Sequence, residues 1–314
     1  GGITYVGNTV TTNSGFITSG LVNGDSLYDV TLTSAGALPA ATVGGGSLTG
    51  ADLGKYTITP SAATGSPGIN SNYNIVYAPG ALTVTPATLT ITAANDSKVY
   101  GATTTSNGLT YTSNTVNTSS GYSAVGLVNG DSIAAVTLTS LGAAPSASVA
   151  GSNYVITPSN ATGTGLSNYN LVYQNGSLSV TPKAVTITAD HATMVYGSST
   201  LPSLTYTDSG LVNGDTLTGS LATVAQAFNG VAGSASNVGT YAITQGTLNA
   251  GSNYAVTYIP ASLTVTPVAL NVTANNRSNV YGVSTGLGAS QFSSTGLVNG
   301  DTISGVVLEY AGQT

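Results

Sequence analysis

The carboxylates that recur most regularly in this sequence are the aspartates at the end of one short repeated phrase. Gly-Leu-Val-Asn-Gly-Asp occurs four times, beginning at residues 20, 126, 210 and 296. A calcium ion takes six to eight oxygen ligands, and each copy of the phrase brings only one carboxylate. Asn-Gly tolerates positive φ and suits a tight turn, and an aspartate can accept hydrogen bonds from nearby N–H groups. We therefore interpret the phrase as turn chemistry and expect no metal. The structural turn residues are Asn23, Gly24, Asp25, Asn129, Gly130, Asp131, Asn213, Gly214, Asp215, Asn299, Gly300 and Asp301.

Other combinations that could carry catalysis are missing. The chain has no cysteine, which removes thiolate nucleophiles, thiolate metal sites and disulfides together. Its one histidine, His191, stands beside Asp190 but has no second imidazole and no serine partner that recurs. Four Lys and Arg residues in 314 cannot make a phosphate-binding surface. The sequence predicts a protein that is not an enzyme, has no cofactor and does not bind nucleic acid.

The 18 tyrosines remain as candidates for recognition. Tyr169 and Tyr173 share one face of an expected strand with Leu171. Such rings pack in a core while their hydroxyls reach a rim or a backbone partner. A carbohydrate-stacking surface is the alternative, although the chain has no tryptophan.

Composition places the chain in the all-β class. Charged residues make up 4 % and hydrophobic residues 41 %, and the net charge is −6. Thr, Ser, Asn and Gly fill the polar positions, and these residues favour strands and turns. No apolar run approaches the roughly 18 residues that would span a bilayer.

A stretch at residues 81–93 organises the rest of the chain, and it returns at 177–189 and 262–274. Each copy is two runs of alternating apolar and polar residues joined at Thr-Pro. The apolar residues have even numbers before Pro86 and odd numbers after it. Because successive strand residues face opposite sides, we interpret each copy as the last strand of one domain leading into the first strand of the next. A join of about two residues predicts a constant relative orientation. One long bent strand inside a single barrel is the alternative. The junction prolines are Pro86, Pro182 and Pro267.

Further phrases recur in step with this stretch. Val-Tyr-Gly begins at residues 99, 195 and 280, and Asn-Tyr opens an alternating run at 72, 168 and 253. They predict a tandem array of small β-sandwich or β-grasp-like domains that forms an elongated rod, with six or seven strands per repeat. The sequence is expected to be a window on a longer array. The predicted repeats are 1–86 (partial, first strand missing), 87–182, 183–267 and 268–314 (partial).

Two details of the repeat are also predicted. Short strands are expected at 108–111 and 203–206, directly after Val-Tyr-Gly. Residues 112–125 lengthen the second repeat before its Gly-Leu-Val-Asn-Gly-Asp phrase, whereas only residues 207–209 bridge the same gap in the third. Length variation at one place indicates a solvent-facing loop.

Taken as a set, the junction, the Tyr-Gly turn, the Gly-Leu-x-Asn-Gly-Asp phrase and the Asn-Tyr run resemble the MBG-type (Tyr-Gly-x class) and related YDG repeats. Those repeats occur in large bacterial surface and secreted adhesins, many of them filamentous-haemagglutinin-like. The resemblance implies an extracellular, tandem all-β stalk with no catalytic residues. The chain departs from the pattern where Met194 and Asn279 replace the lysine found at Lys98, and no aspartate follows Tyr100 or Tyr196.

The predicted function is structural: a stalk or fibre-forming segment of a bacterial extracellular adhesin or filament, secreted or at the cell surface. It would present or link other domains and self-associate in a biofilm matrix. The expected partners are other copies of the chain or neighbouring repeats, with no membrane span in this segment. The alternative is an adhesin module for cell adhesion that binds a surface glycan or host protein through its variable loops.

Overall fold

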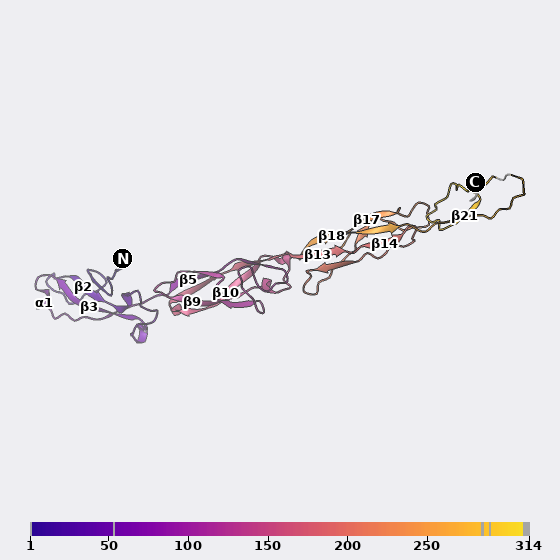
Figure 1. The fold of residues 1–314 in the computed structure, drawn as a ribbon. Helices are drawn as coiled ribbons and strands as arrows, with labels where there is room; N and C mark the ends of the chain where they lie inside the picture. The colour runs from indigo at the N-terminus through magenta and orange to yellow at the C-terminus, as the bar shows by residue number, and fades with distance from the viewer. Residues whose placement is uncertain (1, 53, 284–285, 289, 310–314) are drawn as a thin grey trace. The chain divides into compact units, whose positions relative to one another are not determined.

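The computed structural model describes residues 2–52, 54–283, 286–288 and 290–309 (Figure 1). Within them the chain forms two compact units. Unit 1 comprises Gly1–Lys98, Ala102–Ala144 and Gly151–Ser179, and unit 2 comprises Val99–Gly101, Pro145–Ala150 and Val180–Thr314. In the part of the chain that is described, every helix is too short or too polar to cross a membrane.

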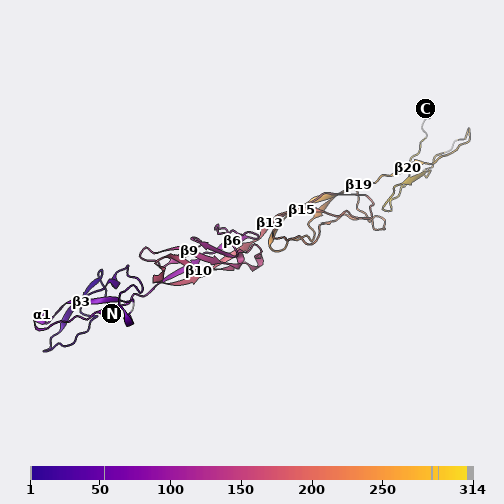
Figure 2. The same cartoon turned by 90° about the horizontal axis from the view of Figure 1, so that it is seen from below.

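The second repeat folds as two β-sheets. One sheet has the strand order β6-β12-β10-β9-β7, and the other has the order β11-β5-β8. Strands β9 and β10 pair antiparallel and lie side by side in both views (Figures 1 and 2). The strands are β5 (Ala87–Ala93), β6 (Asp96–Val99), β7 (Thr115–Thr118), β8 (Tyr122–Val125), β9 (Ser132–Thr139), β10 (Tyr154–Thr164), β11 (Tyr169–Gln174) and β12 (Gly176–Thr181).

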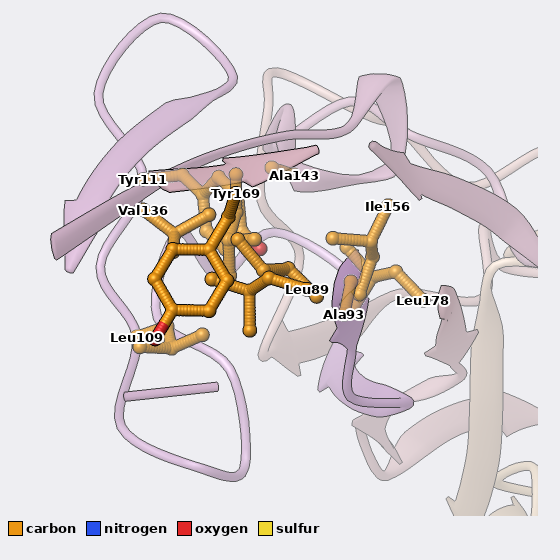
Figure 3. Close-up of a cluster of buried hydrophobic side chains, with 11 residues drawn as sticks. Leu89, Ala93, Leu109, Tyr111, Val136, Ala143, Ile156, Tyr169 and Leu178 are labelled. Carbon is orange, nitrogen blue, oxygen red and sulfur yellow. The ribbon is translucent and has the colours of Figure 1, made fainter. Parts of the chain in front are cut away.

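The core of this repeat lies between the two sheets (Figure 3). On β5 the side chains of Leu89, Ile91 and Ala93 are buried, and the threonines between them are only half-buried. Val136 on β9 and Leu178 on β12 close the core from the other sheet. This alternation is what a period-two apolar pattern requires of a strand with one buried face. The prediction of an all-β fold made of tandem repeats is confirmed.

The first two strands of the repeat, β5 and β6, lie beside its last two, β11 and β12. β5 pairs parallel with β11, from Ala87 opposite Tyr169 to Thr92 opposite Gln174. The chain then continues from β5 into β6 and from β11 into β12, and β6 neighbours β12 in the other sheet. The repeat is therefore closed by a pairing between segments about 80 residues apart.

The third repeat, in unit 2, has the same plan. Its sheets have the orders β15-β13-β18 and β14-β19-β17-β16. β13 pairs parallel with β18, and β14 pairs parallel with β19. Ile187, Ile243 and Leu263 are fully buried in its core. The strands are β13 (Lys183–Ala189), β14 (Ala192–Val195), β15 (Tyr206–Ser209), β16 (Ala222–Thr223), β17 (Gly239–Thr244), β18 (Tyr254–Ile259) and β19 (Ala261–Thr266).

Within the described residues, the first and fourth repeats have fewer strands. The first is a four-stranded sheet in the order β1-β2-β3-β4, and the fourth is the pair β20 and β21. In the first repeat, residues 73–78 follow the short helix α1 but form no strand, although the sequence predicts one there. These elements are β1 (Thr9–Thr12), β2 (Leu27–Thr33), β3 (Tyr56–Gly65), α1 (Ile69–Asn72), β4 (Gly80–Leu82), β20 (Asn271–Ala274) and β21 (Phe292–Thr295).

Five short 3₁₀ helices complete the described elements. One caps β2 and its counterpart caps β9, each with a serine whose hydroxyl accepts a hydrogen bond from a glycine N–H. They are η1 (Ala35–Ala37), η2 (Gly50–Asp52), η3 (Leu141–Ala143), η4 (Val149–Gly151) and η5 (Leu166–Asn168).

Two local predictions are wrong. Residues 112–125 are not a free loop, because they contain β7, which pairs with β9, and β8, which pairs with β5. The expected strands at 108–111 and 203–206 are also absent: Thr110 makes only an isolated bridge to Thr104, and β15 begins at Tyr206. Thr and Ser are common in both strands and turns, so local alternation does not reveal which edge a short segment reaches.

Tyr111 brings a pH dependence to the second repeat. Its side chain is buried, its hydroxyl has no hydrogen-bond partner among the described residues, and burial, aided by the charge of Asp96, raises its pKa to about 12. An unfolded tyrosine titrates near pH 10. Below pH ~10 the tyrosine is protonated in both the folded and the unfolded state, and the stabilisation is fully present. Between pH ~10 and ~12 only the unfolded state releases the proton, so the folded state loses stability relative to it.

We therefore expect the stability of the second repeat to fall by about 1.4 kcal/mol per pH unit in that window from this group alone. The measurement is urea unfolding from pH 8 to 11, comparing the native chain with Tyr111→Phe. The variant should be close to neutral at pH 8, because an unpaired buried hydroxyl contributes little, and should lose less stability above pH 10. Tyr28→Phe, at an exposed tyrosine, is the control. Parallel pH curves for native chain and Tyr111→Phe would contradict the assignment.

Candidate functional site

Each Gly-Leu-Val-Asn-Gly-Asp phrase forms the same tight turn. In the second repeat φ is 58° at Asn129 and 78° at Gly130, and the other three copies differ by no more than a few degrees. The Asp131 N–H donates to the Val128 carbonyl oxygen at 3.0 Å and closes the turn. A type I′ turn needs positive φ at both central residues, which explains the Asn-Gly pair.

The aspartate of the turn is bound by the tyrosine of the Asn-Tyr run. In the second repeat the Tyr169 hydroxyl donates to Asp131 Oδ2 and accepts from the Val128 N–H. Burial raises the pKa of Tyr254 in the third repeat, and its hydrogen bond to Asp215 adds to the rise, so the neutral hydroxyl stays a donor. The hydroxyl-to-carboxylate distances are 2.7 Å for Tyr73–Asp25, 2.9 Å for Tyr169–Asp131 and 2.7 Å for Tyr254–Asp215.

The asparagine of the same turn reaches a segment of the preceding sequence repeat, and each such pair lies within one of the two units. In unit 1 the Asn129 side chain donates to the Pro39 carbonyl oxygen at 2.6 Å. In unit 2 the Asn213 side chain donates to the Pro145 carbonyl oxygen at 3.1 Å. The Asn299 side chain, also in unit 2, donates to the Tyr196 hydroxyl at 2.8 Å.

The asparagine of the Asn-Tyr run makes a second contact of this kind. Asn168 Oδ1 accepts from the Val43 N–H, and Asn253 Oδ1 accepts from the Val149 N–H, both at 2.9 Å. The side-chain oxygen therefore satisfies a loop N–H of the repeat before it in sequence. An amide can do this because it offers an acceptor without a charge that would have to be desolvated.

The Val-Tyr-Gly phrase of one repeat contacts the Asn-Gly-Asp turn of the next repeat in sequence. Tyr100 donates its hydroxyl proton to Asp215 Oδ2 at 2.9 Å and packs edge-on against the Tyr254 ring, with centroids 5.4 Å apart. Gly101 has a φ of +84°, and a Cβ there would lie 2.6 Å from Val212 Cγ2. Only glycine combines this backbone conformation with such a close approach.

The repeated phrases thus meet in one arrangement, which we call the junction contact. It consists of the Asn-Gly-Asp turn and the Asn-Tyr start of one repeat against the Tyr-Gly and loop segments of the repeat before it in sequence. The prolines flank it: Pro86, Pro182 and Pro267 all lie outside strands, the last two directly after β12 and β19. Proline lacks the N–H that a ladder position would need.

Sequence reasoning recognised the turn but missed its partners. The four phrases were each interpreted alone, while the structure brings Asp215, Tyr254 and Tyr100 together over 154 residues of sequence. Their joint recurrence, always in the same order, was the signal that could have indicated contact. Some other tyrosine hydroxyls reach backbone partners, as in Tyr173 accepting from the Ala161 N–H.

His191 has a structural partner. Its Nδ1 lies 2.9 Å from Ser262 Oγ and accepts from the Ser262 N–H at 3.3 Å. In the second repeat Asn95 occupies the same position and its Oδ1 accepts from the Ser177 N–H at 2.8 Å. His191 therefore replaces an amide that holds the start of a strand, and in the structure its ring contacts no carboxylate at hydrogen-bonding distance.

The described residues offer no centre for a metal ion. Nowhere in the described ranges do three or more His, Asp or Glu side chains gather in a group that could bind one. In the junction contact the carboxylates accept hydrogen bonds from tyrosine hydroxyls, and the side chains of Asn129 and Asn213 donate to backbone carbonyl oxygens. Its chemistry is that of a satisfied polar network, which orders the groups it connects.

These features define a class: tandem all-β repeats whose recurrent residues join one repeat to the next. The family model described as "MBG domain (YGX type)" matches residues 89–179 and 185–264, more than half of the sequence. The chain belongs to this family, whose repeats are typical of extracellular surface proteins and of non-enzymatic modules. No curated protein matches it. A solved structure, "I-band fragment I67-I69 from titin", aligns with 83 % of this chain and 87 % of its own at 12 % identity and a TM-score of 0.26.

The Asp215 side chain accepts hydrogen bonds from both Tyr100 and Tyr254, and its replacement tests how much these two bonds contribute to stability. Asp215→Asn keeps the shape but removes the charge that accepts from Tyr100 and Tyr254, and we expect a loss of about 1–3 kcal/mol in the unfolding of the third repeat. The measurement is urea unfolding at pH 7. Asp208→Asn, on an exposed position of β15, removes the same charge and should cost less than about 0.5 kcal/mol. Equal effects would mean that net charge alone is responsible.

Proposed function

We propose that this chain is a structural stalk or linking segment of a bacterial extracellular adhesin or filament, secreted or displayed at the cell surface. The observation that carries the proposal is that the recurrent residues make contacts between one repeat and the next in sequence. Asn129, Asn213 and Asn299 each donate to a segment of the preceding sequence repeat, and Asp215 accepts from Tyr100 of the repeat before it. Side chains that are used in this way connect repeats and are not available to a ligand.

Chemical composition and family support the same proposal. The family is typical of extracellular surface proteins, and charged side chains are only 4 % of the chain. The absence of cysteine means that stability depends on the sandwich cores and the polar junction network rather than on disulfides. Such repeats can be added one after another without new chemistry, because each brings its own half of the next junction.

The test is whether neighbouring repeats keep a constant relative orientation. Because the chain has no cysteine, spin labels can be placed at two exposed positions, Asn170→Cys in the second repeat and Thr257→Cys in the third. Pulsed electron–electron distance measurement should give one narrow distribution. Two Gly-Ser pairs inserted after Pro182 should broaden it, while the same insertion after Ser119, between β7 and β8, should not. A broad distribution in the native chain would overturn the proposal.

Binding of a surface glycan or host protein is the second candidate function. It was expected to use residues 112–125, but most of that segment pairs within the two sheets. What stays outside the strands there is residues 112–114 and the short turn 119–121. A glycan array probed with the native chain and with a variant carrying Gly-Ser in place of that turn separates the candidates, since loop-borne binding should disappear in the variant.

A further inference from the structure

Two of the Asn-Gly turns are alike in sequence and backbone and differ only in their surroundings. Residues 210–216 and 296–302 both read Gly-Leu-Val-Asn-Gly-Asp-Thr. In both turns φ is 58° at the asparagine and 77° at the glycine after it. Asn213 and Asn299 therefore have the same intrinsic reactivity, and a difference between them has to come from the residues packed around each turn.

An Asn-Gly pair can undergo a reaction that needs no enzyme. The glycine backbone nitrogen attacks Cγ of the asparagine, and the approach is easy because glycine has no Cβ. A bond forms between that nitrogen and Cγ, the Cγ–Nδ2 bond breaks, and ammonia leaves with the proton of the glycine N–H. Water then opens the cyclic imide. Cleavage between the nitrogen and Cγ gives aspartate, and cleavage between the nitrogen and the main-chain carbonyl carbon gives isoaspartate.

The turn at Asn213 is open to this reaction. Asn213 and Gly214 are both exposed, and a Cβ at Gly214 would meet nothing within 4 Å. Among the described residues the Gly214 N–H has no hydrogen-bond acceptor, and the Asn213 side chain makes one hydrogen bond, from Nδ2 to the Pro145 carbonyl oxygen at 3.1 Å. Turning the side chain towards the Gly214 nitrogen therefore breaks a single exposed hydrogen bond.

The turn at Asn299 is closed to the same reaction. Asn299 is buried, and both ends of its amide are held: Nδ2 donates to the Tyr196 hydroxyl at 2.8 Å, and Oδ1 accepts from the Ala235 N–H at 3.0 Å. A Cβ at Gly300 would lie 2.4 Å from Ala232 Cβ. Turning this side chain breaks two hydrogen bonds in a buried place, beside a glycine that has little room to move.

We propose that Asn213 deamidates spontaneously in the folded chain and thereby loses its junction contact, whereas Asn299 is protected. The product carboxylate cannot donate to the Pro145 carbonyl oxygen, as the amide does. Isoaspartate also adds a carbon to the backbone of the turn, which the Asp215 N–H closes on the Val212 carbonyl oxygen. This goes beyond the stalk role, because it gives the contact at Asn213 a chemical lifetime that the contact at Asn299 does not share.

The test follows both amides in the same chain. The chain is kept at pH 8 in buffer and, in parallel, in concentrated urea, and is then digested at mildly acidic pH, where the reaction is slow. Cleavage after tyrosine and phenylalanine places Asn213 and Asn299 in different peptides, and mass spectrometry measures the fraction of each that has lost its amide. In urea the two rates should be equal. In the folded chain Asn213 should react at least about tenfold faster, because the protected amide reacts only when its turn opens locally.

Gly214→Ala separates imide formation from direct hydrolysis of the amide. A Cβ on residue 214 hinders the attack of its nitrogen on Cγ but does not hinder the attack of water. The variant should therefore lose the Asn213 amide more slowly than the native chain in urea, where the strain of the folded turn has no influence. An unchanged rate would overturn the proposed reaction.

Asn213→Asp reproduces one of the two products and tests the effect on the junction contact. Its urea unfolding midpoint for the third repeat should be lower than that of Asn237→Asp, which adds the same charge at an exposed position of the same repeat. Equal midpoints would overturn the loss of the contact. Equal rates for Asn213 and Asn299 in the folded chain would overturn the proposal as a whole. So would an Asn213 amide that persists in the folded chain while the unfolded chain reacts.

Discussion

Replacing Gly210 by alanine should destabilise the third repeat by about 2–4 kcal/mol. Its φ of +110° is a conformation that side-chain-bearing residues rarely adopt, which costs about 1–3 kcal/mol by itself. A Cβ at Gly210 would also lie 2.6 Å from the Ala184 carbonyl oxygen, at the start of β13. The strand or the loop would have to move, and the first pairs of β13 with β18 would be disturbed.

The matched control is Gly214→Ala in the same phrase. Gly214 also has positive φ (+77°), but a Cβ there meets nothing within 4 Å, so only the backbone strain of about 1 kcal/mol is expected. Guanidinium unfolding of the two variants and the native chain measures the difference. Equal losses for the two variants would show that the close approach to Ala184 is relieved without cost.

Truncating Ile91 to alanine should cost the second repeat about 2–5 kcal/mol, the range for large-to-small changes in a packed core. Ile91 is fully buried in the middle of β5, between β8 and β11. Removing three carbons leaves a cavity that Leu138 and Leu178 of the other sheet cannot close without moving the sheet.

Val272→Ala tests the same position of the motif in the fourth repeat. Val272 corresponds to Ile91, yet it is 43 % exposed and its strand β20 pairs, among the described strands, only with β21, so the change should cost less than about 1 kcal/mol. Unfolding of both variants, followed at low protein concentration, gives the comparison. A large loss at Val272 would mean that the fourth repeat has a core of its own.

Much of the fold follows from local patterns. The alternation through Leu89 and Ile91, the change of parity at Pro86 and the recurrence of the phrases were enough for an all-β tandem array and for the family. The positive φ of each Asn-Gly pair follows from residue type alone. These features are readable because they depend on a residue and its near neighbours in sequence.

The remaining features depend on residues far apart in the chain. Nothing near Tyr100 indicates that it donates to Asp215, which lies 115 residues later. The run at Tyr73 is as strand-like as the run at Tyr169, but only the second has β5 beside it, and a strand needs a ladder partner as well as a pattern. The strands β7 and β8 are missed for the same reason, because their ladder partners are β9 and β5, which lie elsewhere in the sequence.

The parallel pairing of the first two strands of the third repeat with its last two has a mechanical consequence. The chain enters the third repeat at the start of β13 and leaves it at the end of β19, and it is β13 with β18, and β14 with β19, that pair parallel. Tension along the chain pulls the entering strand and the leaving strand in opposite directions along their own axes. Both ladders are then loaded in shear, and their hydrogen bonds share the load instead of opening one at a time. Forced unfolding is governed by the unfolding rate, so each repeat should resist a pull far better than its modest core would suggest.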